Sequence, residues 1–116
     1  MKKILIIDDD PKICEYLTTL FDDNGYATAS AKNAQEALEL VNSEPFDLIT
    51  LDLEMPGEWG PRFYSRMAQD RNLKNIPVIV ISGMSGNEYA ISKAVASLTK
   101  PFDRKELLKI VRDVLD

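Results

Sequence analysis

The chain has 116 residues, 45% of them hydrophobic and 28% charged, with a formal net charge of −5, one cysteine and no histidine. This length predicts one domain with one hydrophobic core. The single cysteine, Cys14, excludes an internal disulfide and is expected to be a small buried side chain. The acidic net charge argues against direct binding to nucleic acid. The missing histidines exclude histidine zinc sites, Ser-His-Asp triads and an internal phosphohistidine, so any chemistry falls to carboxylates, hydroxyls and lysine.

The N-terminal segment resembles neither a signal peptide nor a membrane span. Its apolar run, residues 4–7, has four residues and is followed by three aspartates, which is too short for either role. Because nothing in the chain requires an oxidising compartment, the sequence predicts a cytoplasmic protein without membrane contact.

Five short apolar segments rich in β-branched residues alternate with amphipathic stretches. This alternation predicts a doubly wound α/β fold, in which one (βα)5 unit over residues 1–116 forms a parallel sheet with helices on both faces. The ligand site of such a sheet lies at the carboxyl ends of its strands. The predicted strands are Lys3–Ile7, Tyr26–Ala29, Asp47–Leu51, Val78–Ser82 and Val95–Leu98.

The first two helices have clear start and stop signals. Asp10 is predicted to cap a helix that begins at Pro11, and Asn24 with Gly25 is predicted to end it. The second helix has its apolar stripe within residues 34–41 and ends before Pro45.

The third helix is predicted to begin at Pro61 and to run through Met67. Asp103 and Glu106 resemble a capping box at the start of the last helix. The wide apolar face of that last helix is formed by Leu107, Leu108, Ile110, Val111, Val114 and Leu115.

Polar residues suited to phosphate or to a hard cation stand at the ends of four predicted strands. Since the first, third and fourth strands are expected to be neighbours, their three carboxylates converge, and each ionised pair about 5 Å apart costs about 3 kcal/mol at an effective dielectric constant near 20. The carboxylates must therefore share a proton or a cation, and Mg²⁺ suits such an oxygen-only site. The residues are Asp8, Asp9, Asp52, Ser82 and Lys100.

Together these residue types describe phosphoryl transfer to a carboxylate. Asp52 is the best acceptor, because it stands alone at its strand end whereas Asp8 and Asp9 are paired and better placed to hold a metal. Lys100 and the Ser82 hydroxyl would neutralise or hydrogen-bond the equatorial phosphoryl oxygens.

Four motifs resemble the receiver domain of bacterial two-component response regulators: residues 4–11, residues 51–57 with Gly60, residues 78–83, and residues 98–102. They occur in the family's order and span the chain. The resemblance implies a flavodoxin-like (CheY-like) sheet of strand order 2-1-3-4-5. It also implies that Asp52 accepts a phosphoryl group from the phosphohistidine of a sensor histidine kinase or histidine phosphotransfer protein, and then switches contacts with a downstream protein.

The resemblance further implies the site roles. Mg²⁺ would be bound by Asp9, Asp52 and the main-chain carbonyl of Glu54, with Asp8 acting through water. Ser82 would be the switch hydroxyl, and the peptide between Lys100 and Pro101 would be cis. Such a domain is not an enzyme in the usual sense, because it catalyses only its own phosphorylation and dephosphorylation.

The segment before Lys100 departs from the family. Most receivers have Gly-Ala and then an aromatic residue three positions before the lysine, where this chain has Lys93, Ala94 and Ser97. Only 17 residues separate Ser82 from Lys100, about one helical turn fewer than is usual in the family. The sequence therefore predicts an atypical, shortened fourth helix and a switch without the usual aromatic side chain.

Each site residue also has an ordinary explanation when it is taken alone. Asp8 and Asp9 suit a turn before a helix, Asp52 a loop, Ser82 a turn with Gly83, and Lys100 a solvated position. Their joint occurrence at four strand ends favours the functional interpretation over the purely structural one.

Two other functions compete with the phosphoacceptor. A phosphorylation-independent interaction module would keep the fold and lose the chemistry. A phosphohydrolase of the haloacid-dehalogenase type also uses an aspartate nucleophile. That family has an acidic residue two positions after the nucleophile, followed by Gly-Thr. In this chain the acidic residue would be Glu54, but Met55 and Pro56 follow it. The sequence leaves open whether the domain acts alone or comes from a longer regulator.

Overall fold

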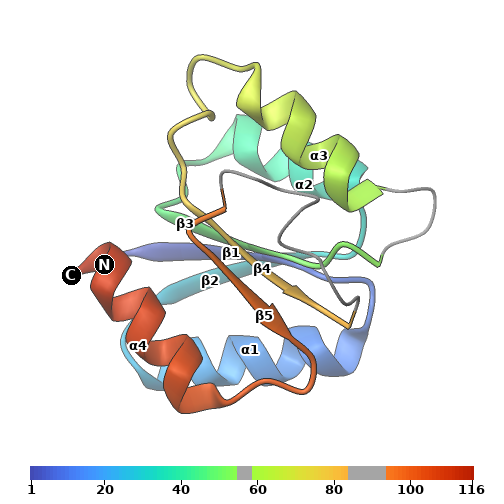
Figure 1. Cartoon of the computed structure of the whole chain (residues 1–116). Helices are drawn as coiled ribbons and strands as arrows, with labels where there is room; N and C mark the ends of the chain where they lie inside the picture. Colours follow the sequence, from blue (N-terminus) through green and yellow to red (C-terminus); the bar gives the residue numbers. More distant parts are fainter. Residues whose placement is uncertain (55–58, 84–93) are drawn as a thin grey trace.

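The computed structural model describes residues 1–54, 59–83 and 94–116, without the side chains of residues 59–61. Within these residues five strands form one parallel sheet in the order β2-β1-β3-β4-β5, which confirms the predicted fold class and strand order. The strands are β1 (Lys3–Ile7), β2 (Ala27–Ala31), β3 (Leu48–Leu51), β4 (Val78–Ser82) and β5 (Ala96–Thr99). The helices are α1 (Pro11–Asp23), α2 (Ala34–Ser43), α3 (Trp59–Ala68) and α4 (Arg104–Leu115) (Figure 1).

Helices cover both faces of the sheet (Figure 1). On one face α2 and α3 pack against alternate strand residues such as Leu5 and Ile49, and Phe63 is fully buried there. On the other face α1 and α4 pack against residues such as Ile4 and Ile79. The central strands β1, β3 and β4 are buried on both faces, which explains why their sequences are nearly continuous apolar runs rather than alternating ones.

Several element boundaries differ from the predicted ones by one or two residues: β2 ends at Ala31, β3 begins at Leu48, and β5 spans Ala96–Thr99. Two further differences have clear local reasons. β2 begins at Ala27 rather than Tyr26, because the backbone N–H of Tyr26 donates to the Phe21 carbonyl at the end of α1. α3 begins at Trp59, so Pro61 lies inside the first turn, where a proline costs no hydrogen bond. The predicted shortened fourth helix falls on residues 84–93, which lie outside the described residues.

The predicted helix caps are present at α1 and α4. Asp10 accepts a hydrogen bond from the Lys12 backbone N–H, and Asp103 accepts one from that of Lys105. Gly25 ends the α1 turn with a φ of +88°, a conformation that glycine adopts at no steric cost. No helix in the described residues combines the length and apolar composition needed to cross a membrane.

Candidate functional site

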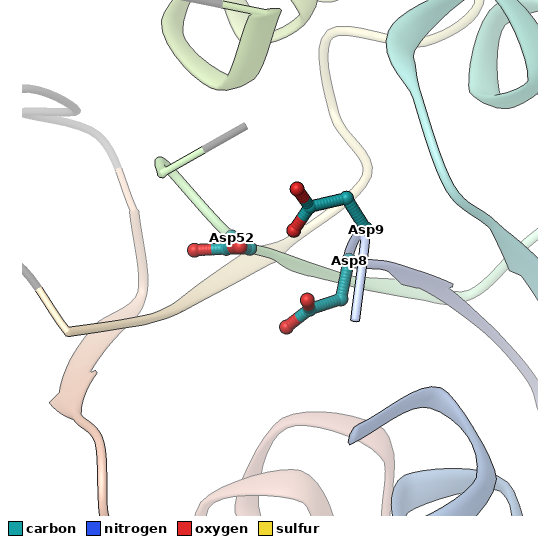
Figure 2. A group of neighbouring side chains, drawn as sticks. All are labelled: Asp8, Asp9 and Asp52. Atoms are coloured by element: carbon teal, nitrogen blue, oxygen red, sulfur yellow. The ribbon is translucent and has the colours of Figure 1, made fainter. Parts of the chain in front are cut away.

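Three carboxylates meet at the carboxyl ends of β1 and β3 (Figure 2). One oxygen from each of Asp8, Asp9 and Asp52 lies within 4.8 Å of the others. The Asp8 and Asp52 residues are each 3% exposed, whereas Asp9 is exposed. The structure therefore brings together the three acidic residues that the sequence predicted to converge, with two of them buried.

The sheet register places these aspartates side by side. Ile7 of β1 is paired with Leu51 of β3, so the next residues along the two strands, Asp8 and Asp52, lie at the same edge. The backbone continues this pairing, because the Asp52 N–H donates to the Ile7 carbonyl over 3.0 Å. A slip of one residue would exchange the side chains that face the two helix layers, so both cores would have to repack.

Backbone N–H groups hold one oxygen of each buried carboxylate. The Asp10 N–H donates to Asp8 Oδ1 over 2.9 Å, and the Glu54 N–H donates to Asp52 Oδ1 over 3.0 Å. Each donor stands two residues beyond its aspartate, as in a turn closed by an Asp side chain. The second oxygen of each carboxylate is thereby oriented for other partners.

Lys100 supplies positive charge to those second oxygens. Its Nζ lies 2.7 Å from Asp8 Oδ2 and 3.7 Å from Asp52 Oδ2. The backbone N–H of Lys100 donates to the Ser82 carbonyl over 2.9 Å, which ties the end of β5 to the end of β4. The peptide between Lys100 and Pro101 is cis, as the family resemblance predicted.

Ser82 lies at the carboxyl end of β4 and is fully buried. Next to it, a Cβ on Gly83 would lie 3.0 Å from the Glu54 carboxylate oxygen Oε2, so the Glu54 side chain extends across the end of β3 to the end of β4. The sequence predicted a metal ligand only for the main-chain carbonyl of Glu54, and the approach of its side chain to Gly83 was not predicted. The side-chain position depends on the loop geometry after Leu53, which no sequence motif specifies.

The charges in this site are unbalanced. Burial raises the pKa of the Asp52 carboxyl group above its ordinary value, and the charges of Asp8 and Asp9 raise it further, against the lowering effects of the Glu54 N–H and Lys100. Burial alone would lower the pKa of the Lys100 ammonium, but its hydrogen bond to Asp8 and the charge of Asp52 raise it overall. Three carboxylates thus surround one ammonium group, an arrangement that favours a further cation.

Cys14 lies closer to the site than the sequence indicated. Its thiol is half-buried rather than part of a closed core, and Sγ donates to the Asp8 carbonyl over 3.2 Å. Burial, together with the charges of Asp8 and Asp10, raises the pKa of the thiol above its ordinary value. Spacing is the one feature of the sequence that could have indicated this position. Cys14 stands four residues after the Asp10 cap, so both residues lie on the same side of α1.

Comparison with known proteins agrees with this geometry. The family model for the response regulator receiver domain matches residues 4–112. Protein Rrf1 of Nitratidesulfovibrio vulgaris is 38% identical over 109 residues, covering 94% of this chain and 79% of its own length. Protein PilH of Pseudomonas aeruginosa is 30% identical, with 99% of this chain and 98% of PilH covered.

A solved structure with the same fold is the response regulator protein TrrA of Thermotoga maritima in complex with Mg²⁺-BeF. It has a TM-score of 0.88 and 32% sequence identity, and the match covers 99% of this chain and all of the TrrA chain. Together with the family match and the site at the strand ends, this likeness decides the class of protein. The chain belongs to the receiver domain family of two-component response regulators, whose members are signalling domains rather than classical enzymes.

Proposed function

We propose that residues 1–116 form one receiver domain in which Asp52 is the phosphoacceptor. The observation that carries the proposal is the position of the Asp52 carboxylate, which is 3% exposed, lies among Asp8 and Asp9, and has the Lys100 ammonium 3.7 Å away. The Glu54 N–H holds Oδ1, which leaves Oδ2 as the attacking oxygen. Asp9 is exposed and stands at the mouth of the site, where a partner can approach.

Mg²⁺ fits the donor set of this site. The ligand atoms are carboxylate oxygens, as Mg²⁺ prefers, and the three negative charges exceed the single positive charge of Lys100. We expect Asp9, Asp52 and the main-chain carbonyl of Glu54 to hold the ion, with Asp8 acting through water. When bound, Mg²⁺ supplies positive charge that offsets the charge on the transferring phosphoryl group. The response regulator TrrA, solved with Mg²⁺-BeF, supports this assignment.

In the proposed reaction Asp52 Oδ2 forms a bond to phosphorus while the bond from phosphorus to the donor imidazole nitrogen breaks. The imidazole keeps the electron pair and is protonated. The Lys100 ammonium, already within reach of Asp52 Oδ2, stabilises the equatorial oxygens, and the Ser82 hydroxyl hydrogen-bonds one of them. The domain catalyses this step on itself.

The donor must come from another protein, because this chain has no histidine. We expect a sensor histidine kinase or a histidine phosphotransfer protein in the cytoplasm as donor and a downstream protein as the receiver of the signal. Ser97 stands in β5 where most receivers have an aromatic residue, so we expect Ser82 to follow the phosphoryl group without an aromatic rotation.

The test is phosphorylation by a small-molecule donor. The wild-type protein incubated with Mg²⁺ and acetyl phosphate should gain one phosphoryl group by intact mass, and Asp52→Ala should gain none. Asp23→Ala, which removes an exposed carboxylate from the end of α1, should behave as wild type. No gain in any of the three proteins would favour the phosphorylation-independent interaction module, and turnover of an aryl phosphate would favour the phosphohydrolase.

Mg²⁺ should also stabilise the fold by mass action. At a free concentration 100 times the Kd, the free energy of unfolding should rise by about 2.7 kcal/mol, which thermal melts with and without the ion measure directly. Asp9→Ala should remove this shift, since the exposed Asp9 carboxylate is a direct ligand in the proposed set. A shift that persists in Asp9→Ala would place the ion elsewhere, and Asp23→Ala is again the matched control.

A further inference from the structure

A groove of about 500 Å³ lies between α2 and α3, on the sheet face opposite α1 and α4 (Figure 1). Apolar residues line its floor: Ala34 and Leu38 from α2, and Phe63 from α3. Arg62 and Arg66 form the α3 wall, and Glu39 stands on the α2 wall. The groove thus combines an apolar floor with one cationic wall.

The cationic wall is part of a segment with a positive net charge, although the whole chain has a negative net charge. Residues 59–82 contain four basic residues and one acidic residue, whereas the remainder has 10 basic and 18 acidic residues. All four basic side chains are exposed. In the part of the chain that the structure describes, three of them have no ion-pair partner: Arg66, Arg71 and Lys74.

The two arginines of the cationic wall lie on one side of α3. Arg62 and Arg66 are four residues apart on α3, so they lie on the same side of the helix, and like charges at this spacing destabilise a helix by a few tenths of a kcal/mol. The core needs only their neighbours, because Phe63 and Met67 provide the buried contacts of α3. Arg66, which has no ion pair among the described residues, therefore offers a guanidinium group to a carboxylate of another molecule, and the planar guanidinium matches the shape of a carboxylate.

We propose that the groove between α2 and α3 binds an acidic, amphipathic helical segment of a partner protein. Apolar side chains spaced at i, i+3 and i+4 would cover Leu38 and the floor, and carboxylates on one flank would pair with Arg62 and Arg66. A polyanion such as a nucleic acid fits less well, because Glu39 stands on the opposite wall and the whole domain has a net charge of −5. This surface is separate from the proposed phosphoacceptor residues, so the two proposals can fail independently.

The probe is a fluorescent 16-residue helical peptide with leucines on one face and glutamates beside them. Fluorescence anisotropy should show binding to the wild-type domain, and amide chemical shifts should change along α2 and α3. The double variant Arg62→Glu/Arg66→Glu should weaken binding at least tenfold and should instead bind a peptide with lysines in place of the glutamates. This exchange of preference shows that the variant is folded.

The matched control is Arg104→Glu/Lys105→Glu, which makes the same change in net charge on exposed residues of α4, on the other face of the sheet. It should bind the glutamate peptide as wild type does. Three results would overturn the proposal: no binding of the glutamate peptide at about 1 mM, equal binding of both peptides by the wild type, or tighter binding of a single-stranded oligonucleotide than of the glutamate peptide.

Discussion

Replacing Asp52 with asparagine is expected to raise the stability of the metal-free domain at neutral pH by about 2 kcal/mol. At an effective dielectric constant of 20, like charges 4.8 Å apart repel by about 3.5 kcal/mol, and Asp52 faces two such neighbours, Asp8 and Asp9. The two repulsions together amount to about 7 kcal/mol. The attraction between Asp52 and the Lys100 ammonium, 3.7 Å away, offsets about 4.5 kcal/mol of that total, which leaves a net repulsion of about 2 kcal/mol. Asparagine keeps the shape and still accepts from the Glu54 N–H, but it brings no charge into the buried site.

The effect has a defined pH dependence. The pKa of Asp52 in the folded, metal-free domain lies above its ordinary value, so the folded state holds this proton more tightly than the unfolded state does. The contribution of that proton to stability is complete below the unfolded pKa and is lost as the pH rises through the folded pKa. The gap between Asp52→Asn and wild type should therefore be small in acid and largest at neutral pH.

Thermal melts in the presence of a chelator measure this gap, which should be about 6–10 °C at neutral pH for a domain of this size. Adding Mg²⁺ should narrow it, because the proposed ion stabilises wild type and has lost a ligand in the variant. Asp70→Asn, a neutralisation two residues beyond the end of α3, is the control. If the melting temperature of Asp52→Asn in chelator is equal to or lower than that of wild type, the proposed excess of negative charge at the site is wrong.

Removing Lys100 should have the opposite effect and a larger one. Lys100→Met removes the ammonium that lies 2.7 Å from Asp8 and 3.7 Å from Asp52 and leaves two buried carboxylates without it. We expect a loss of about 3 kcal/mol in the metal-free domain, near the lower end for a broken buried pair because Lys100 itself is partly exposed. Since the Lys100 pKa is raised, its contribution is complete at neutral pH and is lost only as the pH rises through that raised value.

Two measurements separate this effect from a general loss of packing. Saturating Mg²⁺ should restore more stability to Lys100→Met than it adds to wild type, because the proposed ion supplies the charge that is missing. In an Asp52→Asn background the same substitution should cost less, and the difference is the coupling energy between the two charges. Lys109→Met, on the exposed side of α4, is the control. Equal costs in both backgrounds would show that Lys100 does not act through Asp52.

The sequence predicted the parts of this site that depend on strand order. Short apolar runs rich in β-branched residues identified β1, β3 and β4 as strands, and a doubly wound sheet makes them neighbours that end at a common edge. The convergence of Asp8 and Asp52 therefore followed from the sequence pattern. The preference of Lys100 for Asp8 over Asp52 did not follow, because it depends on the rotamers of these side chains. The contacts of Cys14 and of the Glu54 side chain were missed for the same reason. These contacts depend on how side chains pack, and such packing leaves no periodic pattern in the sequence.

The ion pair between Lys100 and Asp8 joins residues 92 positions apart in the chain. Four segments from both halves of the polypeptide must reach the same edge before the carboxylates, the serine and the ammonium are neighbours. A partly unfolded chain in which β5 and α4 have detached keeps the aspartates but loses the one lysine that, in the described residues, lies beside them. The proposed phosphorylation of Asp52 therefore requires the complete fold, and we expect an incompletely folded molecule to produce no signal.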